Sequence, residues 1–259
     1  LGLPPELSEG TLGDLGPQDH VICHPKSSFY LTMDFGVQAQ VSLVIAEPYA
    51  VHWRHFYMLR LFHRRFFRIL TRRRLFVREV PNAVYFNHFF AQVADVPDGI
   101  PKTRQISIIA SGMRKLVGHK LRHSVIDRIR AEGLEVDVLG RAYKPFDKKW
   151  EGLAPYRYSV VIENSREEGY VTEKLIDTLL CDTIPIYWGA PDIAEMFDTH
   201  GMILCESEDG IMDVLRGPEA FLATSAPDAM RDNRQRALDL LNSTKRMAEL
   251  VYAEAVKAP

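Results

Sequence analysis

The feature that most constrains the fold is the alternation of apolar and polar segments between Tyr158 and Phe197. Tyr158–Ile162 is apolar and β-branched, which is typical of a strand buried on both faces. Thr172 can cap a helix whose apolar residues recur at helical spacing, and Thr183–Trp188 is a second β-rich run. Because two strands joined through a helix are normally parallel, with a right-handed crossover, this stretch predicts a parallel α/β sheet.

The polar residues of this stretch fall where such a sheet binds ligands, beyond the carboxyl ends of its strands. Glu163 and Asn164 end the first strand, and the helix capped by Thr172 begins at the same edge. A helix N-terminus offers free N–H groups and a partial positive charge, which suits a phosphate, and Lys174 adds a full charge. Glu173 makes sense there if its carboxylate accepts hydrogen bonds from hydroxyls. The local pattern predicts a site for a nucleotide that also carries hydroxyls.

Three short sequence motifs within the stretch resemble those of a known family. They are Ile162–Ser165 (IENS), Tyr170–Lys174 (YVTEK) and Ile184–Gly189 (IPIYWG). In this order they resemble the donor-binding segment of the α1,3/4-fucosyltransferases, glycosyltransferase family 10, over about 40 residues, and more weakly from Ser107 to Glu206. The alternative is that a parallel α/β protein carries such words by chance. The resemblance implies a GT-B-like fold, in which two Rossmann-like αβ domains face each other across a cleft.

The rest of the chain fits two αβ domains. We expect an N-terminal, acceptor-side domain over residues 1–100 and a nucleotide-sugar-binding domain over residues 101–259, with a helical C-terminal tail. The segment Val93–Lys102, rich in Pro, Gly and Asp, reads as the link. Expected strands lie at 21–23, 29–32, 41–46, 67–70 and 83–86, then at 105–110, 134–139 and 202–205; expected helices lie at 52–62 and, in the tail, at 234–256.

Composition excludes several classes of function. With 259 residues the chain can form one large or two small domains, and its net charge of −2 predicts no general affinity for nucleic acid. Cys23, Cys181 and Cys205 are odd in number, and we interpret them as reduced cysteines of a cytosolic protein. We find no signal peptide and no apolar run of membrane-spanning length. Since animal members of the resembled family are membrane-anchored Golgi proteins, we expect a bacterial, cytoplasmic protein.

Glycosyl transfer to a hydroxyl needs a base, positive groups for the leaving phosphates, and a donor held in line. The sequence has no Asp-x-Asp, the motif typical of transferases that hold their donor through a divalent metal. This favours leaving-group stabilisation by side chains, with Lys174, Arg141 and Arg122 as candidates. Arg141 follows a predicted strand, and Arg122 lies where a polar loop enters a helix. For each arginine the alternative is a solvated surface residue.

Glu47 is the predicted base, because it follows the apolar strand that ends at Ala46 and a strand's carboxyl end faces the ligand. Family members carry a Gly-Glu-Asn-like word at a corresponding place, and its Glu is taken as the general base. Here the Glu is flanked by Ala46 and Pro48, so its neighbours depart from that word. The alternative is an ordinary surface loop.

The resemblance also assigns three donor contacts. It implies that Asn164 and Tyr170 contact the donor and that Glu173 binds hydroxyls of the ribose or sugar. The alternatives are an Asx turn for Asn164, a core aromatic for Tyr170 and a simple first-turn carboxylate for Glu173.

Two further patterns need an interpretation. The pairs His52/His55 and His119/His123 have no third ligand at a telling distance, so we predict surface or core histidines and no metal site. The stretch Arg54–Arg78 is strongly basic and aromatic. It could contact an anionic membrane surface or acidic glycolipid acceptors, and its alternative is an amphipathic helix and strand with a solvated basic face.

Together these residues predict an inverting, metal-independent transferase with no required cofactor. It would move L-fucose or a related sugar from a GDP-sugar, GDP-L-fucose being the expected donor, to a hydroxyl of a glycan or glycolipid acceptor. The alternatives are a transferase for a different nucleotide sugar and a non-catalytic nucleotide- or glycan-binding protein. A glycoside hydrolase ranks below these, since it needs two facing carboxylates and only Glu47 is well placed in the first domain.

Overall fold

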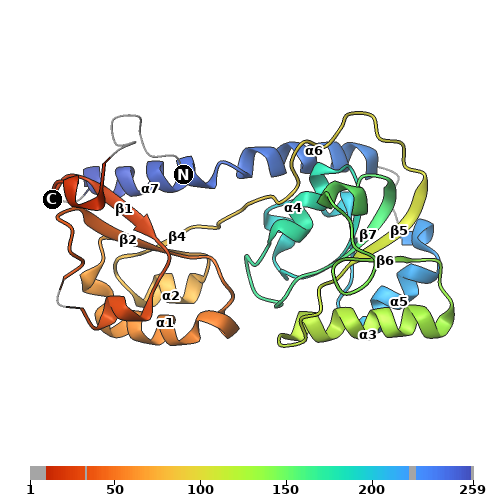
Figure 1. The fold of residues 1–259 in the computed structure, drawn as a ribbon, viewed down its shortest axis with the longest axis horizontal. Coiled ribbons are helices and arrows are strands. Elements are labelled where there is room, and N and C mark those ends of the chain that lie inside the picture. The colour runs from red at the N-terminus through yellow and green to blue at the C-terminus, as the bar shows by residue number, and fades with distance from the viewer. Residues whose placement is uncertain (1–9, 33, 222–225, 258–259) are drawn as a thin grey trace. The chain divides into compact units, whose positions relative to one another are not determined.

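The computed structural model describes residues 10–32, 34–221 and 226–257 of the chain. They form two compact units, each built on its own parallel sheet (Figure 1). The first unit holds the described residues up to His88 together with those from Ser243 onward, and the second unit holds the described residues from Phe89 to Asn242. The boundary between the units therefore lies after residue 88, whereas the sequence predicted it after residue 100. The described chain returns to the first unit from Ser243 onward.

The first unit contains a four-stranded sheet in sequential order. Its strands are β1 (His20–Cys23), β2 (Gln40–Ile45), β3 (Ile69–Thr71) and β4 (Ala83–Tyr85), and all neighbouring pairs are parallel. Two helices, α1 (Tyr49–Phe62) and α2 (Arg74–Glu79), follow β2 and β3. Since successive side chains of a strand point to opposite faces, the side chains of β2 pack alternately into two hydrophobic cores, one on each face of the sheet.

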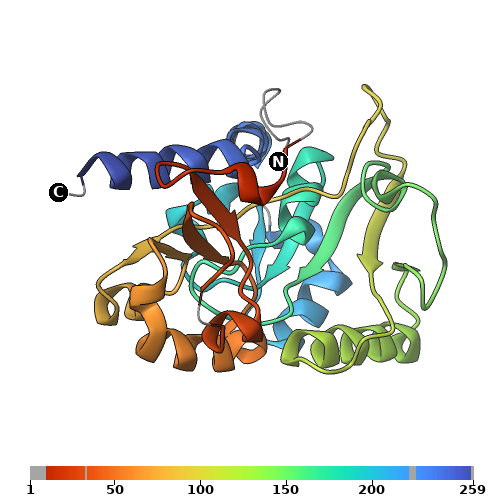
Figure 2. The ribbon, with the colours of Figure 1, turned by 60° about the vertical axis from the view of Figure 1, so that its left-hand side comes forward.

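The two faces of this sheet are covered by different helices, as Figures 1 and 2 show. Leu43 and Ile45 pack with Phe56 of α1 and Phe76 of α2. On the other face Val44 packs with residues of α7 (Ser243–Lys257), the last helix of the chain. Because α7 packs here, the helical tail belongs to the first unit, where the sequence predicted the second.

The second unit is a doubly wound sheet. Its strands are β5 (Arg104–Ile109), β6 (Asp137–Leu139), β7 (Tyr156–Ile162), β8 (Ile184–Trp188) and β9 (Ile203–Leu204), in the spatial order β6-β5-β7-β8-β9. All pairs are parallel. The strand order reverses between β5 and β7, and ligands of such sheets bind beyond the carboxyl ends of the strands at this reversal.

Helices cover both faces of the second sheet. One core joins the sheet to α3 (Val117–Glu132) and α5 (Glu208–Arg216), and the other joins it to α4 (Glu173–Leu180) and α6 (Ala226–Leu240). Adjacent residues of β7 alternate between these cores, Val160 and Ile162 facing the first and Val161 the second. The predicted strand–helix–strand stretch is confirmed as β7, α4 and β8.

Two local predictions were wrong. Residues 29–32 were expected as a strand, but Ser27–Tyr30 is a 3-10 helix that lets the Tyr30 hydroxyl reach His55 Nδ1 at 2.9 Å. A four-residue apolar run does not distinguish these structures without its packing partners. The helix expected over 234–256 is two helices, because the chain leaves helical geometry after Leu240 and resumes at Ser243.

The cysteines of the described chain are all free thiols. Burial raises the pKa of Cys181 to about 12 and that of Cys205 to about 11, so these thiols stay protonated at neutral pH. This agrees with the prediction of reduced cysteines. In the part of the chain that the structure describes, we find no helix with the length and apolar character needed to cross a membrane.

Candidate functional site

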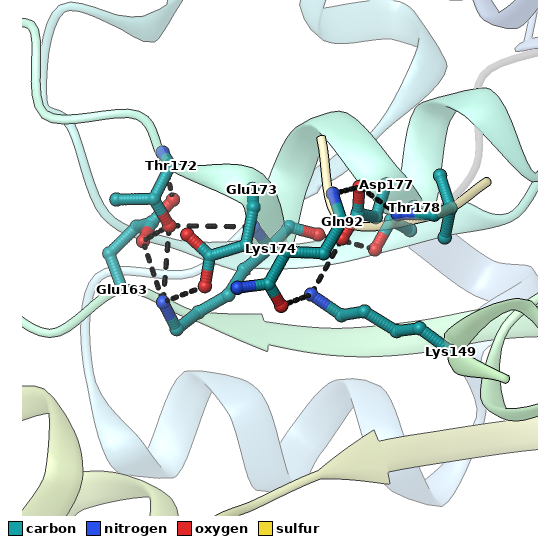
Figure 3. A network of polar contacts seen from close by, with 9 residues as sticks. Gln92, Lys149, Glu163, Thr172, Glu173, Lys174, Asp177 and Thr178 are labelled. Carbon is teal, nitrogen blue, oxygen red and sulfur yellow. Dashed lines mark hydrogen bonds and ion pairs between the residues drawn. The ribbon is translucent and has the colours of Figure 1, made fainter. Parts of the chain in front are cut away.

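A buried carboxylate joins the end of β7 to the start of α4. Thr172 is the N-cap of α4, and its Oγ1 accepts a hydrogen bond from Lys174 N. Thr172 N donates to Glu163 Oε1 at 2.8 Å, and Thr172 Oγ1 donates to Glu163 Oε2 at 2.6 Å (Figure 3). Glu163 follows β7 directly and is fully buried. The helix N-terminus is therefore fixed in place at the carboxyl edge of the sheet.

The Lys174 ammonium lies at this helix start and is only partly exposed. Its Nζ donates to Glu173 Oε1 at 2.9 Å and to Thr172 Oγ1 at 3.1 Å, and it lies 3.8 Å from Glu163 Oε2 (Figure 3). The predicted pair Glu173 and Lys174 is therefore brought together in one cluster. A lysine held this way has lost much of its conformational freedom before a ligand arrives, which lowers the cost of binding an anion.

The two carboxylates of the cluster differ in electrostatics. Burial raises the pKa of Glu163, and the Lys174 charge and the hydrogen bonds from Thr172 oppose that rise. Burial alone would also raise the pKa of Glu173, but Lys174, assisted by Lys149, holds it below its ordinary value. Glu173 is thus the carboxylate that stays ionised and can accept hydrogen bonds from ligand hydroxyls.

Arg122 is brought to the same place, and it is buried. It extends from α3 and donates to the carbonyl oxygen of Ile162, the last residue of β7. Burial lowers the pKa of its guanidinium, while the nearby Glu163 and Glu173 act in the opposite direction. The alternative of a solvated helix residue is therefore wrong for Arg122, because its charge is compensated inside the protein.

The start of α3 lies against the loop that follows β7. Gly118 N donates to Asn164 O at 3.1 Å, and a Cβ built on Gly118 would lie 1.7 Å from Glu163 O. Only glycine allows this approach. The Asn164 Oδ1 atom is buried and forms no hydrogen bond of standard geometry within the described chain, although the Asn164 side chain interacts with the His119 imidazole. Oδ1 can therefore accept a hydrogen bond from a donor group on a ligand.

Two aromatic residues lie next to this cluster. Tyr170 is buried, as expected for either a donor contact or a core aromatic. His119, in the first turn of α3, accepts a hydrogen bond from Leu116 N through Nδ1 at 3.3 Å. Burial, reinforced by Arg122 and Lys174, lowers the pKa of His119, so the imidazole is neutral at physiological pH.

Arg141 lies apart from the cluster. It is exposed in the turn after β6, two strands away from β7, which corresponds to roughly 10 Å across the sheet. Among the described residues it forms no hydrogen bond or ion pair with another side chain. It shares the carboxyl edge with the other candidates, but the structure does not bring it into contact with them.

Glu47 lies in the first unit, exposed in the bend between β2 and α1. The carboxyl edge of this sheet also carries Arg72, a buried side chain after β3 that donates to Ala46 O. His24 follows β1, and its ring lies 6.5 Å from the ring of His88, which follows β4. The predicted position at a strand end is confirmed, and the role of Glu47 as a base stays a prediction.

Sequence reasoning missed a second polar cluster one turn further along α4. Asp177 is fully buried and accepts hydrogen bonds from Gln92 N at 2.8 Å and Val93 N at 3.1 Å. Lys149 Nζ lies 2.6 Å from Asp177 Oδ2 and donates to Gln92 Oε1 at 3.0 Å (Figure 3). A carboxylate inside an apolar helix pattern was the one available signal, since a buried charge needs partners. This cluster fixes the segment after His88 to helix α4.

The paired histidines have structural partners. The rings of His52 and His55 pack 5.1 Å apart, and His123 Nδ1 bonds with Tyr143 Oη at 2.6 Å. Among the residues that the structure describes, no three of His, Cys, Asp or Glu gather closely enough to hold a metal ion.

Comparison with known proteins relates the region that contains the site to a family. Residues 101–207 match glycosyltransferase family 10 (fucosyltransferase), C-terminal domain. These residues are less than half of the chain, and over this stretch the chain resembles the C-terminal domain of family 10 glycosyltransferases. The family 10 domain runs from the end of the link through β9 and contains Arg122, Arg141, Asn164, Tyr170, Glu173 and Lys174, whereas Glu47 lies outside it.

Curated relatives match only part of the chain. A stretch of 78 residues is 44% identical to the α-(1,3)-fucosyltransferase FucT of Helicobacter pylori, covering 30% of this chain and 16% of that protein. A stretch of 93 residues is 32% identical to α-(1,3)-fucosyltransferase B of Drosophila melanogaster, covering 33% and 20%. The matched stretches thus span a fifth or less of these relatives.

Solved structures resemble most of the described fold. An α1,3-fucosyltransferase with GDP matches with a TM-score of 0.51 at 18% identity, covering 86% of this chain and 68% of that one. TarM of S. aureus matches with a TM-score of 0.60 at 11% identity, covering 93% and 55%. At these identities the likeness concerns the fold. It confirms the predicted class: two parallel α/β units of the kind found in GT-B glycosyltransferases.

Proposed function

We propose that this protein is an inverting, metal-independent glycosyltransferase that moves L-fucose or a related sugar from a GDP-sugar to a hydroxyl of a glycan or glycolipid. The observation that carries the proposal is the cluster of Glu163, Thr172, Glu173 and Lys174 at the start of α4, within the family 10 domain. The relatives' names and the GDP-bound structural neighbour supply the donor class.

Lys174 and the N-terminus of α4 would hold the diphosphate. As the bond between the anomeric carbon and the β-phosphate oxygen breaks, negative charge grows on GDP, and the ammonium stabilises it. Lys174 would exchange its hydrogen bond to Glu173 for one to phosphate, which leaves the Glu173 carboxylate free for ribose or sugar hydroxyls. The lowered pKa of Glu173 is consistent with an ionised carboxylate that accepts hydrogen bonds from hydroxyls.

The other residues of the family 10 domain would position the donor. Asn164 would accept a hydrogen bond from the donor through Oδ1, which is buried and forms no hydrogen bond of standard geometry in the described chain. Arg122 holds the end of β7 through Ile162 O and raises the local positive potential. Arg141 would contribute charge from the turn after β6, at the same carboxyl edge of the sheet, and Tyr170 would supply a wall of the site.

Glu47 would act as the base. Its carboxylate would take the proton of the acceptor hydroxyl while that oxygen attacks the anomeric carbon from the side opposite the leaving GDP, which inverts the configuration. The test is transfer and donor hydrolysis with Glu47→Gln, which keeps the shape and removes the basicity. We expect a loss of roughly 10²- to 10⁴-fold in kcat with GDP affinity unchanged; full activity would remove Glu47 as the base.

Titration of nucleotides separates the alternatives. Fold neighbours also include complexes with UDP, so a different nucleotide sugar is the second candidate. Calorimetric titration with GDP and UDP distinguishes the two, because the proposal predicts binding of GDP and weaker binding of UDP. Binding of GDP without turnover of any GDP-sugar would instead identify a non-catalytic nucleotide-binding protein.

A further inference from the structure

The outer face of α1 carries a row of large apolar side chains. Trp53, Tyr57 and Leu61 are spaced by four residues, so they lie above one another along one face of the helix. Their exposed fractions are 49%, 62% and 64%. The opposite face of α1 holds Phe56 and Leu59, which are buried in the core of the first unit. The helix is therefore apolar both toward the core and toward its surroundings.

The surroundings of this row are strongly basic. The chain from Tyr49 to Arg78 contains no aspartate or glutamate, while nine arginines lie between Arg54 and Arg78. The whole chain has a net charge of −2, so the basic charge is concentrated in this segment. A surface of this composition attracts anions at short range and repels cationic partners.

Several of these arginines are available to an external anion. Arg54, Arg64 and Arg78 are exposed, and none of them forms an ion pair with a carboxylate of the described chain. The guanidinium of Arg54 lies over the Trp53 ring at 5.2 Å. By contrast Arg60, on the same helix, pairs with Glu79 of α2. The apolar row thus has unpaired positive charge at both ends.

We propose that the outer face of α1 docks on an anionic lipid bilayer. Trp53, Tyr57 and Leu61 would enter the headgroup region, where amphipathic aromatic rings are favoured. Arg54 and Arg64, at the two ends of the row, would contact lipid phosphates, each adding electrostatic attraction that falls with salt. The combination of exposed apolar side chains with basic residues is that of helices lying in the membrane interface.

The apolar row decides between a bilayer and a soluble polyanion. An acidic glycan in solution would bind the arginines but would leave the three adjacent large apolar side chains in water, so their burial would contribute nothing to its affinity. A bilayer interface accommodates both kinds of side chain at once. The proposal concerns the first unit and stands independently of the donor site in the second unit.

Tryptophan fluorescence gives a direct readout of docking. Trp53 is exposed, whereas Trp188 is buried and Trp150 is partly buried, and these are the three tryptophans of the chain. We expect phosphatidylglycerol-containing vesicles to shift the emission to shorter wavelength and phosphatidylcholine vesicles to leave it unchanged. In Trp53→Phe the shift should disappear while vesicle co-sedimentation persists. An unchanged emission spectrum in the native protein would overturn the proposal.

A matched pair of variants tests the residues. The triple variant Trp53→Ser, Tyr57→Ser, Leu61→Ser should lose about tenfold or more of its affinity for anionic vesicles. The control Tyr252→Ser removes an exposed aromatic ring from α7 of the same unit and should leave the affinity unchanged. Circular dichroism melting and GDP titration check that each variant is folded. Equal vesicle binding by the triple variant and the native protein would overturn the proposal.

The charge contribution is tested separately. Arg54→Gln combined with Arg64→Gln should weaken co-sedimentation, and raising the salt concentration should weaken it in the native protein. Dextran sulfate serves as the soluble polyanion. If it binds with the affinity of anionic vesicles, and the triple serine variant binds both equally well, the face is a polyanion site and the bilayer proposal is wrong.

Discussion

Both carboxylate oxygens of Glu163 bind Thr172, one through the backbone N–H at 2.8 Å and one through the hydroxyl at 2.6 Å. The two positions are nine apart in the chain, and the loop between them carries Asn164 and Tyr170. The contact therefore closes this loop and sets where α4 begins. The positions of Glu173 and Lys174, the first two residues of that helix, depend on it.

Removing the Thr172 hydroxyl should weaken this link. Thr172→Val keeps the side-chain volume but deletes the hydrogen bond to buried Glu163 and the N-cap of α4. We expect a loss of about 1–3 kcal/mol in the free energy of unfolding, measured by urea denaturation. Thr103→Val, at an exposed position, should change it by no more than about 0.5 kcal/mol. Equal stability of the two variants would contradict the role of Glu163.

The buried pair of Lys149 and Asp177 should be strongly coupled. Lys149→Met leaves a fully buried carboxylate with only two backbone donors, which should cost about 3 kcal/mol of stability. Asp177→Asn keeps an oxygen for those donors and removes the charge. In a double-mutant cycle the double variant should therefore be more stable than the sum of the single losses predicts. Additive losses would show that the two residues do not interact.

Gly118 should tolerate no side chain. A Cβ there would lie 1.7 Å from Glu163 O, a backbone atom that cannot move without displacing the end of β7. Gly118→Ala should destabilise the protein by about 2–3 kcal/mol and weaken GDP binding together with stability. The matched control is Gly112→Ala, whose Cβ would have its nearest neighbour at 3.8 Å. Its melting temperature should equal that of the native protein, and a similar loss in both variants would contradict the steric explanation.

Stability of the first unit should fall in mild acid because of His52. Burial, with the charges of His55, His24 and Arg72, lowers the pKa of His52 from 6.5 to about 4. Between these values the unfolded chain binds a proton that the folded chain does not, so the free energy of unfolding falls as pH drops from 6.5 to 4. We expect about 2 kcal/mol at most, since the side chain is partly exposed to solvent. His52→Gln should reduce the slope of the pH profile of unfolding, to which the lowered pKa values of His20, His55 and His88 also contribute. An unchanged slope would exclude His52 as a cause.

The sequence predicts the donor-side elements because their signals are local. A strand buried on both faces, a capping threonine and a helical apolar repeat all lie between Tyr158 and Trp188, and β7, α4 and β8 follow them closely. The positions of Glu173 and Lys174 were predictable for the same reason, since they are the first residues of a helix at a strand's carboxyl edge.

The unpredicted features depend on contacts between distant residues. Gln92 and Asp177 are 85 residues apart, and the local sequence around each of them does not predict the hydrogen bond between them. The burial of Arg122 was also missed. The sequence of α3 shows apolar residues next to Arg122 but does not show that the end of β7 packs against this side chain. The tail helix was assigned to the wrong unit, since an amphipathic pattern indicates an apolar face but does not identify the surface that covers it.

Calorimetric titration of GDP into the native protein and into Lys174→Ala tests the central claim, that the start of α4 holds the donor's phosphates. The matched control is Arg231→Ala, which removes an exposed positive charge from α6 of the same unit. We predict that Lys174→Ala loses about 1.5–3 kcal/mol of GDP binding free energy, roughly 10- to 100-fold in Kd, while Arg231→Ala binds GDP as the native protein does. Equal GDP affinity in Lys174→Ala and the native protein would contradict the claim.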